Sequence, residues 1–143
     1  MSQTPKSFAK KVRAFANDIP RLQNEIKKEV VKEVALQVVG DTPVRTGQAR
    51  NNYFFTVGSP DRTSQTFGPF GPATRSGIFS LNRMYAVIKR VRPGERVYMA
   101  NNLPYIERLN DGWSQQARAG FIQAAIEAGR EIIRRQVIRF RNY

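Results

Sequence analysis

The 143-residue sequence contains neither cysteine nor histidine. Without cysteine there is no disulfide framework, no thiolate nucleophile and no cysteine-type zinc site. Without histidine, Ser-His and Cys-His nucleophilic sites and the commonest metal ligand are also excluded. No apolar run approaches the ~20 residues of a membrane span, and residues 1–11 lack the apolar core of a signal peptide. We therefore expect one soluble domain over residues 1–143, made in the cytoplasm, with no membrane contact.

Acidic residues are scarce. The chain carries 24 lysines and arginines against 11 acidic residues, a net charge of +13. Such a balance favours a polyanionic partner, either a nucleic acid or an acidic protein surface. The excess is spread along the chain, with no basic tail. Two interpretations stay open: a positive binding face, or a soluble surface that has excess arginine.

The first 40 residues show the pattern of a long amphipathic helix. Thr4 followed by Pro5 is a good start signal, and Gly40 a plausible end. Pro20 inside the pattern predicts a kink, or a fresh start near Asp18. The apolar stripe packs on the chain's own sheet or, in part, on another subunit. Its members recur every three or four positions: Phe8, Val12, Phe15, Ile19, Leu22, Ile26, Val30, Val34 and Val38.

The rest of the chain alternates short strands with helices. Aromatic and β-branched residues predict a strand, and apolar spacings of three and four predict helices. We therefore expect an α+β fold, in which a small, mainly antiparallel sheet is packed by the N-terminal and C-terminal helices. The expected segments are a strand at 51–57, a long loop at 58–77, a helix at 78–91, a strand at 96–101, a short helix or turn at 104–109 and a helix at 119–141.

Two segments are candidate interfaces. Loop 58–77 is rich in glycine and proline, and long loops of this kind are usually functional or disordered. Its Phe67 and Phe70 either fold back onto the core or dock on a partner. The last helix has an arginine face opposed only by Glu127 and Glu131, which is either solvated or binds carboxylates or phosphates. This face consists of Arg130, Arg134, Arg135, Arg139 and Arg141.

Residues that would support catalysis are not arranged in a recognisable site. The carboxylates outside the first helix select no pair or cluster for Mg²⁺ or for glycoside hydrolysis. The glycines of loop 58–77 are not followed by the Lys-Ser/Thr of a phosphate-binding loop. No zinc finger, basic zipper or RNP-type strand is present either. We expect no enzyme activity, no catalytic residue, no cofactor and no metal.

Three fragments carry a family resemblance: TPVRTGQAR (42–50), YMANNLPYIERLNDGWS (98–114) and QQARAGFIQAAI (115–126). Their order and content resemble the neck and tail-completion proteins of tailed bacteriophages, including minor tail proteins of the lambda Z type. The family often has Asp where this chain has Arg45, and Pro where it has Arg118. The residues that match the family pattern are Pro43, Thr46, Gly47, Asn101, Tyr105, Gly112, Ser114, Gln116, Ala117, Gly120 and Phe121.

The resemblance implies a structural role in the virion. Copies would form a ring, a hexamer or else a dodecamer, that completes the tail and joins it to the capsid connector. The adjoining connector and tail proteins would be its partners, and genomic DNA in an axial channel would make non-specific contact. The alternative is a small basic nucleic-acid-binding module that acts as a monomer or dimer.

Overall fold

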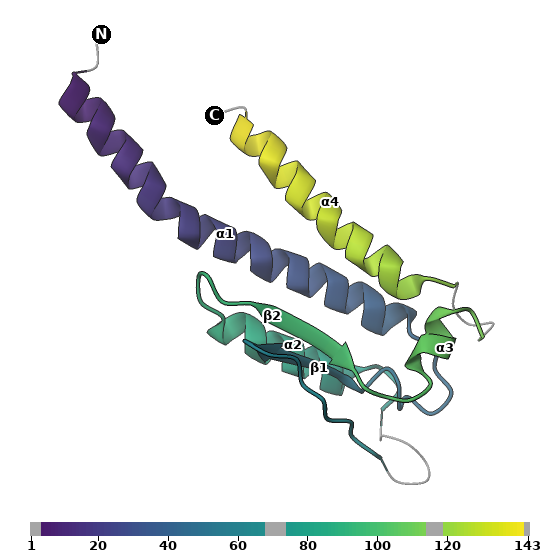
Figure 1. The fold of residues 1–143 in the computed structure, drawn as a ribbon. Helices are drawn as coiled ribbons and strands as arrows, with labels where there is room; N and C mark the ends of the chain where they lie inside the picture. The colour runs from purple at the N-terminus through teal and green to yellow at the C-terminus, as the bar shows by residue number, and fades with distance from the viewer. Residues whose placement is uncertain (1–3, 68–73, 114–118, 142–143) are drawn as a thin grey trace.

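The computed structural model describes residues 4–67, 74–113 and 119–141, with side chains as far as Ile138 in the last range. It has a long N-terminal helix, a C-terminal helix and an antiparallel pair of strands, which confirms the predicted α+β fold (Figure 1). The elements are α1 (Pro5–Asp41), β1 (Tyr53–Val57), α2 (Ile78–Arg90), β2 (Val97–Asn101), α3 (Ile106–Asn110) and α4 (Phe121–Arg141).

Helix α1 begins at the predicted signal. The Thr4 hydroxyl accepts a hydrogen bond from the Ser7 amide at 3.3 Å, and Pro5 occupies the first turn, where its missing N–H costs nothing. The helix then runs for 37 residues through Pro20, so a fresh start near Asp18 is wrong. Its axis does change direction within its first half (Figure 1). Proline removes one backbone bond and bends a helix that packing elsewhere holds together.

The end of α1 is set by Pro43. Gly40 lies inside the last turn, and the helix continues to Asp41, one residue beyond the predicted end. A proline disfavours helical conformation at the preceding residue, and Thr42 is extended, with φ −64° and ψ 125°. The Thr42 amide and hydroxyl both donate to the Val38 carbonyl, at 3.0 and 2.6 Å. The final turn is therefore closed before the chain leaves it.

Helix α1 is the central element of the fold. It lies between α4 on one side and the strand pair with α2 on the other (Figure 1). Two strands alone are marginally stable in water, so the sheet depends on this helical cover. The buried apolar cluster takes residues from every element except β2: Ala35, Val38, Val39, Ala49, Tyr53, Phe55, Met84, Val87, Leu103, Ile106, Phe121 and Ala125.

The strands pair in one register, from Tyr53 opposite Asn101 to Val57 opposite Val97. Tyr53 and Phe55 are buried, as the alternation of a strand requires. Phe54 points to the other face, where the Arg83 guanidinium lies 4.0 Å from its ring centre. The strand begins at Tyr53, not at Asn51 as predicted, because the backbone amides of Asn51 and Asn52 are used by the preceding turn.

Candidate docking surfaces

The turn after α1 is built around Arg50. Its guanidinium donates to the Thr42 carbonyl from Nε and Nη2, at 3.1 and 2.9 Å, and to the Gly40 carbonyl at 2.9 Å. A cation there satisfies carbonyls that the helix end leaves unpaired, and opposes its partial negative charge. Partial burial lowers the pKa of Arg50. The turn is thus anchored to the end of α1 by a side chain eight residues beyond Thr42.

Asn51 connects the same turn to α2. The side-chain oxygen accepts from the Phe79 amide at 3.2 Å, and the side-chain nitrogen donates to the Gly47 and Thr74 carbonyls, each at 2.9 Å. Gly77, at the N-cap of α2, has no side chain that could cap the helix. Asn51 supplies that cap from 28 residues away along the chain. The side chain is fully buried; its bond to the Gly47 carbonyl is buried, and the bonds to the Thr74 carbonyl and the Phe79 amide are partly buried.

The described start of loop 58–77 is held by its own subunit. The Asn52 side chain makes two bonds to the backbone of Gln65. Its Oδ1 accepts from the Gln65 amide at 2.7 Å, and its Nδ2 donates to the Gln65 carbonyl at 3.0 Å. Asn102 donates to the carbonyls of Asp61 and Thr63, each at 2.9 Å. Arg83 reaches Gln65 Oε1 at 2.6 Å. This part of the loop is therefore held by hydrogen bonds within its own chain.

Phe67 of this loop is half-buried against α2. Its ring stacks on that of Phe79 with centroids 5.7 Å apart and planes 20° apart. One face of the Phe67 ring is therefore in contact with α2 of its own chain. Phe70 lies outside the described residues. Contact of either ring with a partner stays a prediction, and Phe79, 38% exposed, extends the same aromatic surface.

Residues of two family-like fragments, 42–50 and 98–114, meet at one end of the molecule. Pro43, Thr46 and Gly47 line a cavity of about 880 Å³ together with Tyr105 and Trp113. We call it the junction cavity. Burial raises the pKa of Tyr105. Trp113, which sequence reasoning did not single out, is 73% exposed at the rim, and Arg108 lies 5.1 Å from its ring centre.

The other matching residues hold this end together. Asn101 donates to the Ala49 carbonyl at 3.0 Å, which connects β2 to the turn. Phe121 is buried in the core at the start of α4. Three matching glycines have left-handed backbones, with φ 90° at Gly47, 89° at Gly112 and 78° at Gly120. The remaining matches, Ser114, Gln116 and Ala117, lie outside the described residues.

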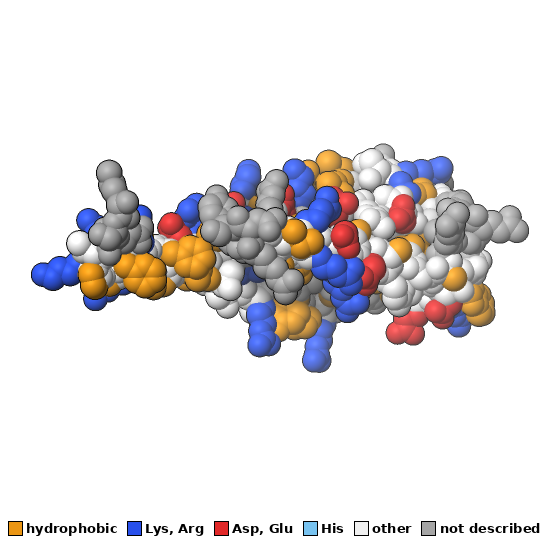
Figure 2. All heavy atoms as spheres, turned by 90° about the horizontal axis from the view of Figure 1, so that it is seen from above, with side chains coloured by type: hydrophobic (Ala, Val, Ile, Leu, Met, Phe, Trp, Pro, Cys, Tyr) orange, Lys and Arg blue, Asp and Glu red, His pale blue; other side chains and the backbone are white. Residues whose placement is uncertain are grey.

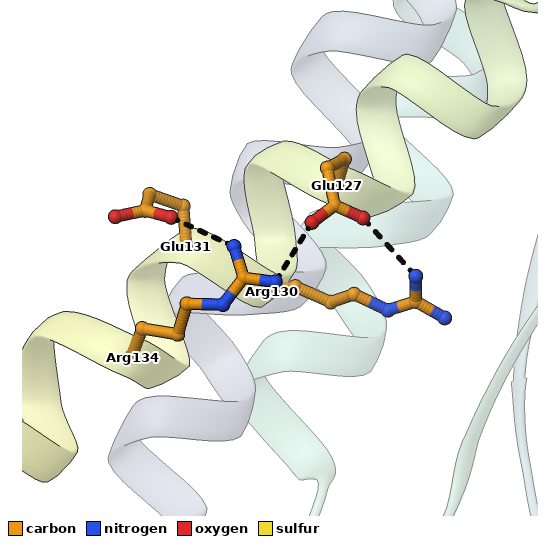
Figure 3. Close-up of polar contacts among 4 residues, drawn as sticks. All are labelled: Glu127, Arg130, Glu131 and Arg134. Atoms are coloured by element: carbon orange, nitrogen blue, oxygen red, sulfur yellow. Dashed lines mark hydrogen bonds and ion pairs between the residues drawn. The ribbon is translucent and has the colours of Figure 1, made fainter.

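The arginine face of α4 contains ion pairs within itself (Figure 3). Glu127 accepts from Arg130 at 3.1 Å and from Arg134 at 3.0 Å, and Arg134 also reaches Glu131 at 3.0 Å. These hydrogen bonds lower the pKa of Glu127. The face is therefore less positive than an arginine count suggests. Within the described part of the chain, exposed Arg135 has no ion pair; the side chains of Arg139 and Arg141 lie outside it.

Sequence reasoning did not identify which apolar surfaces stay uncovered. The first part of α1, residues 5–22, projects beyond the C-terminal end of α4, and we call it the arm (Figure 1). Residues 8–18 are all exposed, including the stripe residues Phe8 (60%), Val12 (49%) and Phe15 (54%). Figure 2 shows hydrophobic side chains along this projecting end. Their spacing was visible in the sequence, whereas their exposure was not.

A second uncovered apolar surface lies beside α4. A groove of about 790 Å³ runs between α1, β2 and α4, and we call it the body groove. On the α4 side, Ile133 and Val137 are 46% and 48% exposed. Its apolar lining comes from Ile26, Val30, Val31, Val97, Ile133 and Val137.

The described residues contain no group of three acidic side chains that could hold a metal ion, and the chain has no histidine or cysteine. None of the helices in these ranges combines the length and apolarity that a membrane span requires. No protein-family model, no curated protein and no solved structure matches this chain.

Proposed function

We propose that this protein is a virion structural protein of a tailed bacteriophage, located at the neck or tail end. Copies form a ring, a hexamer in preference to a dodecamer, that completes the tail and joins it to the capsid connector. The ring makes and breaks no covalent bond. It acts through the shape and charge of its faces and leaves an axial channel for DNA.

The observation that carries this proposal is the junction cavity. Three fragments that resemble the phage family are spread over more than 80 residues, from Thr42 to Ile126. Residues of the first two line one cavity, and Phe121 of the third packs in the core nearby. The second and third fragments adjoin in the sequence, so the fold contributes the approach of the first fragment to them at one end of the molecule. The exposed Trp113 and Tyr105 at this end suit a docking face for an adjoining ring.

Charge supports partners that are acidic. Each copy carries +13, so a hexamer carries 6 × 13 = +78. Repulsion at that density is offset when acidic faces of the connector or tail, or DNA phosphates in the channel, lie against it. Exposed Arg135, which has no ion pair within the described residues, is available for such contacts, whereas Arg130 and Arg134 already pair with Glu127 and Glu131.

The proposal is tested by the mass and location of the protein. Native mass spectrometry of the protein released from purified virions should give six or twelve copies per particle. Phage that lack the gene should accumulate filled heads and separate tails. Virions that do not contain the protein would refute the proposal.

The net charge of +13 also fits the alternative function, a small nucleic-acid-binding module. Such a module binds duplex DNA by itself, with an affinity that falls steeply as salt concentration rises. A neck protein instead joins a phage partner, and its free form has little affinity for short duplexes. Titration of the purified protein with a labelled duplex at several salt concentrations separates the two functions.

A further inference from the structure

The arm and the body groove are two uncovered apolar surfaces of the same chain. Helix α4 runs antiparallel to α1, so that Gln136 lies beside Glu29, at 3.5 Å between Nε2 and Oε2. The described part of α4 ends at Arg141, and the arm projects beyond that end (Figure 1). Stripe residues Ile26 and Val30 line the groove beside α4, whereas Phe8, Val12 and Phe15 continue the stripe with nothing described over them.

The spacing of the stripe indicates what covers it. Its first six members, Phe8, Val12, Phe15, Ile19, Leu22 and Ile26, are separated by 4, 3, 4, 3 and 4 residues. This repeat of 3.5 residues is the seam that a helix presents to another helix. The body groove offers such a partner, because Ile133 and Val137 expose an apolar edge of α4 to it.

We propose that the arm of one copy docks in the body groove of the next copy, head to tail. The inference rests on the proposed ring and names the surfaces that join its subunits. Heterologous contacts of this kind generate a ring when the rotation between copies closes. Phe8, Val12 and Phe15 of one copy would pack against the α4 edge and β2 of its neighbour.

A single contact between arm and groove is small, and an isolated pair would therefore be weak. An arm of 18 residues is about 27 Å long and about 10 Å wide, so half of its surface is about 420 Å². A stable interface needs about 800 Å² per partner. Each copy in a closed ring gives one arm and receives another, which doubles its buried area. The contact therefore favours a closed ring over an isolated pair.

Charge gives this contact a distinctive salt dependence. The arm carries Lys6, Lys10, Lys11, Arg13 and Arg21 against Asp18, a net +4. The groove is lined by Lys27 and Arg96 with one acid, Glu95. Docking brings like charges together, so salt should strengthen it by screening them. Binding to DNA or to an acidic ring has the opposite dependence.

The first experiment measures the mass of the full-length protein by light scattering at about 0.1 M and about 1 M salt, where the Debye length falls from about 10 to about 3 Å. The wild type should assemble, more strongly at high salt. The variant Phe8→Ser/Phe15→Ser should have the mass of one chain with unchanged helicity. The control Ala14→Ser/Asn17→Ser alters the opposite, exposed face of the arm and should assemble like the wild type. Unchanged assembly of the first variant overturns the inference.

A second experiment exploits the absence of cysteine. Val12→Cys in one population and Val137→Cys in another should give a mixed cross-linked dimer when combined with a short bis-maleimide. The variant Phe15→Cys alone tests whether two arms pair with each other. If it cross-links to itself more readily than Val12→Cys cross-links to Val137→Cys, the head-to-tail contact is overturned. A wild type that stays monomeric also overturns the head-to-tail contact. That result would not refute the proposed function, because a neck ring can still assemble on its connector.

Discussion

Replacing Asn51 with alanine should destabilise the protein more than its small size suggests. The change removes three hydrogen bonds of one fully buried side chain, to the Phe79 amide and to the Gly47 and Thr74 carbonyls. A hydrogen bond contributes about 1 kcal/mol net, and an abandoned buried partner costs about 1–3 kcal/mol. Since two of these bonds are only partly buried, water can reach some of the groups left behind. We expect a loss of about 3 kcal/mol in the free energy of unfolding.

The assay is urea unfolding followed by circular dichroism, with Asn82→Ala as the matched control. Asn82 is exposed on α2, where alanine has the higher helix propensity, so the control should match or slightly exceed the wild type. Hydrogen exchange gives a second measurement. The Phe79 amide should exchange faster in Asn51→Ala, because it loses the side-chain oxygen that accepts its hydrogen bond. A loss below about 1 kcal/mol for Asn51→Ala, or unchanged exchange at Phe79, would refute the idea that this side chain caps α2.

Three further changes test other parts of the structure. Gly77→Ala should cost about 2–5 kcal/mol by urea unfolding, because φ is +81° and the added Cβ would lie within van der Waals overlap of the buried Val39 side chain; a neutral result would contradict this packing. Burial raises the pKa of Tyr53 to about 12, so its contribution is complete below about pH 10 and is lost as the pH rises through 12. The wild type should therefore lose on the order of 2–3 kcal/mol over that range relative to Tyr53→Phe, and parallel pH profiles would exclude the effect. Arg134→Glu/Arg135→Glu should lower the melting temperature only slightly, because the ion pairs of Arg134 with Glu127 and Glu131 are exposed, while it abolishes joining of heads and tails; normal infectious yields would mean that this face binds no partner.

The sequence by itself determined the order and kind of the elements. Thr4 with Pro5, the aromatic strand near Tyr53 and the apolar spacings of α2 and α4 act within one or two turns, so they can be read without the fold. The predicted ends of the helices and strands were less accurate. Helix α1 runs one residue beyond Gly40 because the nearer constraint is Pro43. Strand β1 starts late because the backbone amides of Asn51 and Asn52 donate to the Gly47 and Ala49 carbonyls of the turn.

Only the tertiary structure decided which apolar and charged faces are covered. Phe8 and Ile26 belong to one stripe with one spacing, yet α4 lies beside the groove at Ile26 and ends before it reaches Phe8. The periodicity of the sequence shows which side of a helix is apolar. Whether that side is buried depends on where the neighbouring helix ends. Likewise, Arg50 and Asn51 are ordinary polar residues in the sequence. They become helix caps because folding places them at the end of α1 and the start of α2, where the terminal carbonyls and amides have no partner within their own helix.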